Sequence, residues 1–111
     1  MSNATIDMAV FKELQEAAGA EFVAELVDTF FEEAPTMLAE LRDAQATGLA
    51  DVFRRAAHSL KSNSNTFGAT RLGEMARDLE LGGLVADTAP LEALEAEYRL
   101  VAAALTGLAH G

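Results

Sequence analysis

The sequence predicts an all-α protein: an up-and-down antiparallel four-helix bundle with a short extra helix at the N-terminal end. Apolar residues recur at spacings of three and four almost throughout the 111 residues, and no convincing strand-like alternation is present. The connections between the expected helices are short, which favours antiparallel neighbours. Because no linker, repeat or low-complexity tract interrupts this pattern, residues 5–111 are expected to form a single domain. Residues 1–4 are interpreted as a tag remnant or a disordered start.

The N-terminal half of the chain predicts one short and one long helix. Asp7 is placed to cap a helix from Met8 to about Ala18, which Gly19 ends. A long amphipathic helix follows and closes near Gly48. Pro35 lies inside it, so a kink or a break into two helices is expected there. Its expected inward residues are Phe22, Val23, Leu26, Val27, Phe30, Ala34, Met37, Leu38 and Leu41.

Three further helices are expected in the C-terminal half. The third runs from Leu49 to about Phe67 and is followed by Gly68, which suits a left-handed stop. Its stretch from Ser62 to Phe67 is rich in poor helix formers, so a loop is the alternative there. The fourth begins at about Thr70 and stops around residues 82–83. The apolar stripes of the three helices are Leu49, Val52, Phe53, Ala56, Ala57, Leu60 and Phe67; Leu72, Met75, Ala76 and Leu79; and Leu91, Leu94, Tyr98, Val101, Leu105 and Leu108.

Composition and charge exclude several classes of function. The chain has no cysteine, so disulfides and thiolate metal sites are excluded, which fits a cytoplasmic protein. The longest apolar run, Leu100 to Leu105, is too short to span a bilayer, and no secretory signal pattern is present. A net charge of −10 argues against binding to nucleic acid or to anionic membranes.

The positive charge is concentrated in one part of the sequence. Residues 54–77 have a balance of +4, which leaves −14 for the rest of the chain. Either the clustering is chance on a solvated face, or it attracts an acidic partner or a phosphoryl group by electrostatic steering. The basic residues are Arg54, Arg55, Lys61, Arg71 and Arg77, against the single acidic residue Glu74.

His58 is expected on the solvent side of the third helix. On a helical wheel, the apolar positions of this segment fall within roughly 80° of one another, and His58 lies about 160° from the middle of that arc. A helical segment therefore argues against a core histidine. The residues that share its face are Arg54, Lys61, Ser62 and Asn65, with Arg55 at the edge.

These neighbours suit phosphoryl chemistry on the ring. Nearby cations favour neutral imidazole, which has the lone pair that a nucleophile needs. Lys61 could pair with the oxygens of a phosphoryl group on His58, and the small Ser62 leaves room for a second protein. The other histidine, His110, is expected to lie in a frayed tail.

Other site types are excluded by their missing motifs. Neither histidine has a glutamate three residues before it, so no zinc or di-iron site is expected. The glycines form no dinucleotide-binding or P-loop pattern, and no hydrolase elbow is present. The chain is thus expected to bind no nucleotide, metal or cofactor of its own, and any phosphate must come from another protein.

The stretch from His58 to Ala69, H-S-L-K-S-x-S-x-x-F-G-A, resembles the signature of histidine-containing phosphotransfer (HPt) domains, H-x-L-K-G-x-x-x-x-x-G-A. The segments IDMAVFKELQEAAGAEFVAELVDTFFEEAP and RLGEMARDLE are similar to the parts of the family on either side, and the resemblance covers about Ile6 to Ala104. It departs from the signature at Ser62, where the family often has glycine. A hydroxyl bonded to phosphate there could change the lifetime of phosphohistidine.

The resemblance implies a helical bundle whose histidine carries phosphate between receiver-domain aspartates in multistep His–Asp relays. His58 would accept and donate the phosphoryl group through Nε2, and Lys61 would stabilise it. Arg54, Arg55, Ser62, Asn65, Gly68 and Arg71 would contact the partner. The implied partners are receiver domains of response regulators and a hybrid histidine kinase. Magnesium would belong to the receiver, and the protein would be a monomer without kinase activity of its own.

Two other functions remain as alternatives. A helical adaptor would bind partners without phosphoryl chemistry, and it should bind equally well after His58→Gln. The phosphoacceptor hairpin of a histidine kinase usually has an acidic residue directly after its histidine, whereas this chain has Ser59. The sequence leaves open whether the domain is free-standing or part of a hybrid kinase.

Overall fold

The computed structural model describes residues 5–110, which form five helices and no strand. They are α1 (Met8–Ala18), α2 (Ala20–Thr47), α3 (Ala50–Thr66), α4 (Thr70–Gly82) and α5 (Ala89–His110). The all-helical prediction is confirmed. The prediction for residues 1–4 lies outside the described residues. No helix in residues 5–110 has the length and apolar character needed to cross a membrane.

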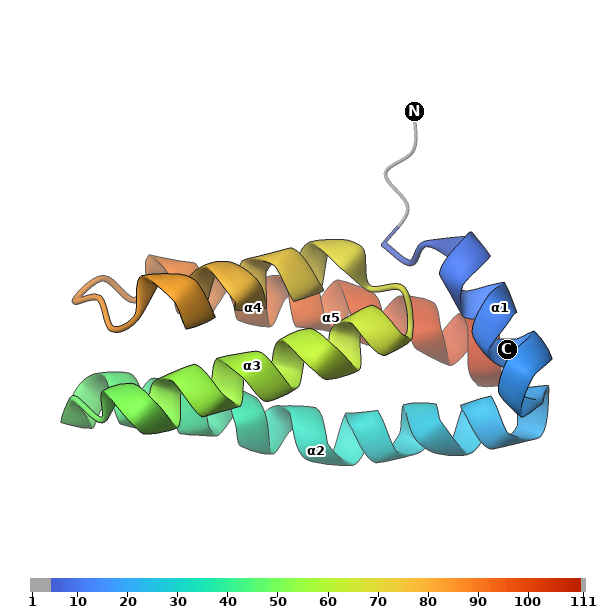
Figure 1. The fold of residues 1–111 in the computed structure, drawn as a ribbon, viewed down its shortest axis with the longest axis horizontal. Coiled ribbons are helices and arrows are strands. Elements are labelled where there is room, and N and C mark those ends of the chain that lie inside the picture. Colours follow the sequence, from blue (N-terminus) through green and yellow to red (C-terminus); the bar gives the residue numbers. More distant parts are fainter. Residues whose placement is uncertain (1–4, 111) are drawn as a thin grey trace.

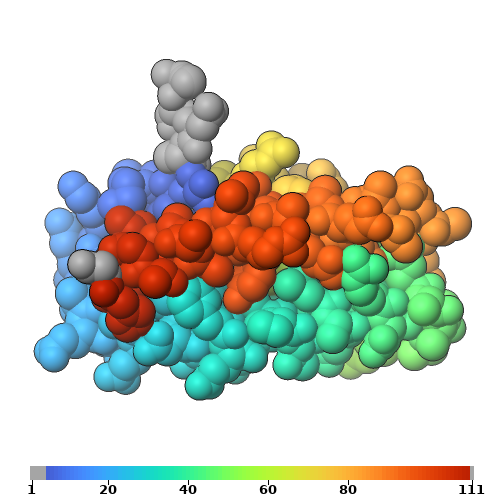
Figure 2. Space-filling model, turned by 180° about the vertical axis from the view of Figure 1, so that it is seen from behind, coloured from blue at the N-terminus to red at the C-terminus, as the bar shows by residue number. Residues whose placement is uncertain are grey.

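The four longer helices lie alongside one another, and α1 packs at one end of them (Figure 1). α3 packs between α2 and α4, and α5 also contacts both of these helices. Figure 2 shows the opposite side of the molecule, where α5 runs along α2. α3 therefore has one flank against α2 and the other against α4, and its remaining face is open to solvent.

The caps predicted from the sequence are present at both ends of the helices. The Asp7 carboxylate accepts a hydrogen bond from the backbone N–H of Ala9 at 3.0 Å, which caps the start of α1. Gly48 ends α2 in the left-handed conformation, with φ of 74°. Gly68, after α3, has φ of 81°, and its carbonyl accepts the backbone N–H of Asp7 at 2.7 Å. The end of α3 is thus tied to the start of the chain.

Of the kink or break predicted at Pro35, the break into two helices is wrong, because α2 continues through Pro35 as one helix of 28 residues. Pro35 removes one backbone hydrogen bond to the carbonyl four residues earlier. The Pro35 side chain is exposed, so this defect lies on the solvent side, where water can satisfy the free carbonyl. Packing of the opposite face against α3 and α5 then holds the helix together.

The core is formed by the inward stripes of all the helices, and most of its residues were predicted. Phe22, Leu49 and Leu108 were expected inside but are exposed, the first two by 51% and 52%. Phe22 lies about 100° from its buried neighbour Val23, at the edge of the stripe. Leu49 is the N-cap of α3, where helical geometry has not yet begun, and Leu108 lies in the last turn of α5.

Ser64 is an unusual core residue because its side chain is fully buried on α3 and its hydroxyl has no hydrogen-bond partner among the described residues. An unpaired buried hydroxyl costs about 1–3 kcal/mol. Ser64→Ala should therefore raise the free energy of unfolding by about 1 kcal/mol or more, measured by urea denaturation. Ser59→Ala on the exposed face of α3 is the control. Its free energy of unfolding should rise only by the smaller difference in helix propensity between serine and alanine. A lower stability for Ser64→Ala would contradict the prediction.

Candidate functional site

His58 lies on the open face of α3, and 58% of its side chain is exposed. α3 continues as a helix to Thr66, so the alternative of a loop after Ser62 is excluded. Ser62 and Asn65 therefore follow His58 at offsets of four and seven residues, on the same side of the helix and exposed. The apolar residues on the opposite side of α3 are buried, which fixes the outward orientation of this face.

Glu80 on α4 connects the two residues of α3 that were expected to perform the chemistry. Its Oε2 lies 2.8 Å from His58 Nδ1, and its Oε1 lies 2.9 Å from Lys61 Nζ. Only 17% of the Glu80 side chain is exposed, against 25% for Lys61. The carboxylate is thus held between α3 and α4, and it joins the exposed imidazole to the less exposed ammonium group.

The contact with Glu80 determines which ring nitrogen of His58 is available. A carboxylate can only accept a hydrogen bond, so the neutral imidazole donates its proton from Nδ1. Nε2 then carries the lone pair. The geometry thus favours the tautomer with Nε2 as the nucleophile, and the exposed ring lets a reactant approach.

The pKa of Glu80 is lowered from its usual value, first by the hydrogen bond with Lys61 and second by that with His58, while burial acts in the opposite direction. A lowered pKa means that folding favours the carboxylate, so its contribution to stability is present above the usual pKa of about 4.5 and is lost as the pH falls through the lowered value.

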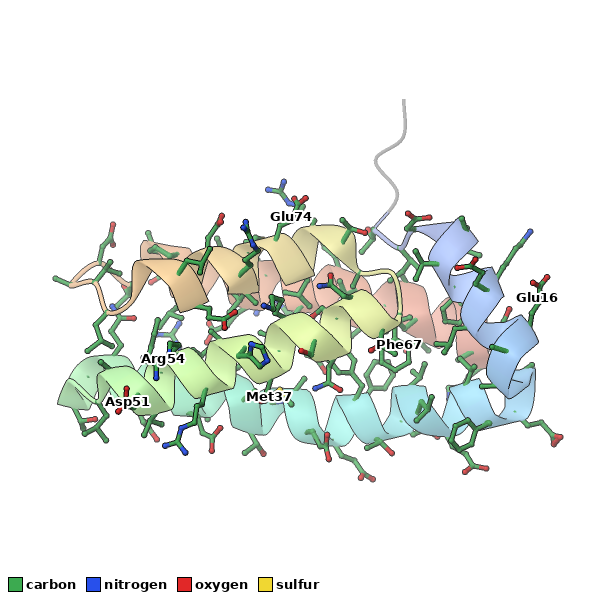
Figure 3. The ribbon with its side chains drawn as sticks, in the orientation of Figure 1. Glu16, Met37, Asp51, Arg54, Phe67 and Glu74 are labelled. Atoms are coloured by element: carbon green, nitrogen blue, oxygen red, sulfur yellow. The ribbon has the colours of Figure 1, made fainter. Side chains whose placement is uncertain are left out.

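Wild type should therefore be more stable than Glu80→Gln at pH 7, and the difference in unfolding free energy should narrow as the pH falls below about 4.5. Urea denaturation from pH 7 to pH 3 measures this difference. Glu74→Gln, on the outer side of α4 (Figure 3), is the control for removing a glutamate that makes neither of these contacts. A difference in unfolding free energy that stays constant from pH 7 to pH 3 would contradict the lowered pKa of Glu80.

Gly73 allows α4 to approach α3 closely near the site. A Cβ atom at Gly73 would collide with the side-chain amide of Asn65. Gly73 and Glu80 are seven residues apart and so lie on the same side of α4, which faces α3. On this side of α4, Gly73 allows the close approach at the N-terminal end and Glu80 makes its contacts toward the C-terminal end. Together they define how α4 lies against the His58 face.

Of the other predicted partner residues, the two arginines of α3 lie near His58, whereas Gly68 and Arg71 lie apart from it. Arg54 Nη2 pairs with Asp51 Oδ1 at 3.1 Å on α3 (Figure 3), and Arg55 Nε donates to the Asp51 carbonyl at 3.4 Å. Both arginines are exposed near His58. Gly68, in contrast, is buried against Asp7, and a Cβ there would lie 2.7 Å from the Asp7 carbonyl oxygen.

Arg71 also lies apart from His58. Its guanidinium Nε is 3.4 Å from the carboxylate of Glu97, a buried residue of α5. Arg71 is therefore turned toward α5, whereas Glu80 on the same helix is turned toward α3. The ion pair gives the buried Glu97 a counter-charge, while most of the Arg71 side chain stays exposed.

A shallow hollow of about 310 Å³ lies on the flank of α3 that faces α2, and His58 does not line it. Glu40 of α2 and Arg55 and Ser59 of α3 line it together with Val52 and Ala56. α3 thus has this hollow on one flank and the Glu80 contacts on the other. Neither the hollow nor Glu80 was predicted from the sequence.

Within residues 5–110, no group of three or more histidine, cysteine, aspartate or glutamate side chains is arranged to hold a metal ion. What the site contains is an exposed imidazole whose Nδ1 contacts a carboxylate, and an ammonium group one turn along that contacts the same carboxylate. This arrangement can accept and release an electrophilic group at Nε2.

In a comparison with known families, the model of the Hpt domain matches residues 25–104. The match includes α3, α4 and most of α2 and α5. Comparisons with curated proteins and with solved structures gave no match.

Proposed function

Because this chain belongs to the Hpt domain family, whose members have a histidine phosphotransfer role in phosphorelays, we propose that His58 accepts a phosphoryl group from the aspartyl phosphate of one receiver domain and passes it to another. The observation that carries this proposal is the contact of Glu80 with His58 Nδ1, because it leaves the exposed Nε2 as the free nucleophile.

The transfer is an in-line displacement at phosphorus. The Nε2 lone pair forms the N–P bond as the bond between phosphorus and the aspartyl oxygen breaks, and the aspartate leaves as a carboxylate. The proton on Nδ1 stays in place, so the product ring is cationic and Glu80 lies against it as a counter-charge. The reverse reaction uses the same atoms and restores the neutral ring.

Lys61 stabilises the transferred group. Its ammonium group has three N–H donors, and Glu80 lies within reach of one of them. The remaining donors are available to the phosphoryl oxygens, whose charge must be stabilised in the transition state. This chain needs no cofactor for the step, since its own part is to position the nucleophile and provide positive charge.

The receiver docks over the open face of α3. Arg54, Arg55, Ser62 and Asn65 are exposed on this face, and the hollow toward α2 offers a recess for a protruding side chain. Gly68 is buried and instead maintains the fold, whereas Arg71 is paired with Glu97 but keeps an exposed side chain and stays a proposed contact at the edge of the interface. All the groups of the site come from one chain, which supports function as a monomer.

The scaffold that we propose is an up-and-down antiparallel bundle of α2 to α5, with α1 as the extra helix. The short connections between these helices support it, since only residues 48–49 join α2 to α3 and only residues 67–69 join α3 to α4. Antiparallel α3 and α4 bring residues 22 positions apart, His58 and Glu80, into contact.

The experiment that tests the function mixes the protein with a panel of phosphorylated receiver domains and locates the transferred label. We expect an acid-labile, alkali-stable label on the wild type and none on His58→Gln. A protein that binds a receiver equally well as wild type and as His58→Gln, without ever acquiring label, would be an adaptor instead.

A further inference from the structure

Arg77 differs from most of the other basic residues between positions 54 and 77, because it has no ion-pair or hydrogen-bond partner among residues 5–110. Three of the other four are paired with carboxylates: Arg54 with Asp51, Lys61 with Glu80 and Arg71 with Glu97. Arg55 binds only a backbone carbonyl, at 3.4 Å. Arg77 is exposed, so its guanidinium charge is available to a partner.

The contacts of α4 place Arg77 on the side of the phosphoacceptor. Gly73 and Glu80 both face α3, and Arg77 lies about 40° from the first and about 60° from the second around the helix axis. Arg71 lies about 160° from Gly73, which agrees with its ion pair to α5. Arg77 is therefore at the solvent edge of the α3–α4 contact, one turn from Glu80.

Most of the positive charge around His58 is offset by neighbouring carboxylates, but that of Arg77 is not paired with one in the part of the chain that the structure describes. Glu80 offsets the charge of Lys61 and Asp51 offsets that of Arg54, so neither pair leaves a net charge on the His58 face. The basic residues without a carboxylate partner are Arg55, at the edge toward α2, and Arg77, at the edge toward α4. These two arginines flank His58, and no carboxylate among the described residues lies within ion-pair distance of either guanidinium, so both can attract an acidic partner.

We propose that Arg77 is a recognition residue for the receiver: it attracts and orients the acidic surface around the partner's phosphoaspartate, and it touches neither His58 nor the phosphoryl group in transit. This inference rests on the proposed function of His58. Charges at the rim of an interface act mainly on the association rate and its salt dependence.

The test measures the second-order rate constant for transfer from a phosphorylated receiver at increasing salt. Arg77→Gln should lower this constant about three- to tenfold at low ionic strength, and the difference should shrink as salt screens the interaction. Arg77→Lys keeps the charge and should restore most of the rate. Arg99→Gln, which removes an exposed arginine of α5, is the matched control and should transfer at the wild-type rate.

Phosphorylation by the small donor phosphoramidate separates partner recognition from chemistry at the ring. Arg77→Gln should be labelled at the wild-type rate with this donor. Equal slowing with phosphoramidate and receiver would overturn the inference, as would receiver transfer at the wild-type rate at every salt concentration. If the wild type itself accepts no label from any receiver, the proposed function fails; if only the Arg77 effect is missing, the inference alone fails.

Discussion

Replacing Glu80 with alanine is expected to slow phosphotransfer to His58 by about ten- to a hundredfold, since small losses of orientation at a reacting group have effects of this size. The variant removes the acceptor at 2.8 Å from Nδ1 and the partner of Lys61 at 2.9 Å. The imidazole can then rotate and can place its proton on Nε2, which blocks the nucleophile. Glu80 is thus a positioning residue that acts through His58.

Glu80→Gln separates the hydrogen bond from the charge. The amide oxygen can still accept a hydrogen bond from Nδ1, but it carries no charge to stabilise the cationic ring of phosphohistidine. The transfer rate of Glu80→Gln is therefore expected to lie between those of Glu80→Ala and wild type. Nitrogen-15 NMR of the imidazole should show the Nδ1–H tautomer in wild type and a larger share of Nε2–H in Glu80→Ala.

Glu74→Ala provides the matched control, because Glu74 is on the outer side of the same helix (Figure 3). Its transfer rate and its His58 tautomer should equal those of wild type. Transfer by Glu80→Ala at the wild-type rate, with the tautomer unchanged, would show that the contact seen at Nδ1 does not orient the nucleophile.

Gly68→Ala is expected to lower the free energy of unfolding by about 2–5 kcal/mol, the sum of backbone strain and overpacking. Gly68 has φ of 81°, a conformation that costs alanine about 1–2 kcal/mol. Its added Cβ would also lie 2.7 Å from the Asp7 carbonyl oxygen and 3.1 Å from Val10 Cβ. Backbone cannot rotate away as a side chain can, so the N-terminal segment must shift.

Gly48→Ala isolates the strain from the overpacking. Gly48 has a similar φ of 74°, but no atom lies within 4 Å of its added Cβ. Gly48→Ala should therefore lower the free energy of unfolding by only about 1–2 kcal/mol, measured by urea denaturation. Equal losses at the two glycines would mean that the contact between Gly68 and Asp7 contributes nothing, contrary to the packing described above.

Features that depend on neighbouring residues along the chain were the most predictable. Helical periodicity, the Asp7 cap and the stops at Gly48 and Gly68 follow from local geometry, and the structure confirms them. The outward position of His58 follows in the same way, because each residue of a helix turns by about 100° and the apolar stripe marks the inside. The errors at Leu49 and Leu108 lie at helix ends, where this rule no longer determines burial.

The order of residues along the chain was enough to predict the helices, the exposed face of α3 and, through the stretch from His58 to Ala69, the resemblance that the family match supports. The contacts of Glu80 with His58 and Lys61, the turn of Arg71 toward α5 and the place of Arg77 at the edge of the site follow from the packing of the helices. A helical wheel gives the direction of each side chain around its own axis alone. How two helices are rotated and shifted against each other depends on their packing, here on the close approach that Gly73 allows.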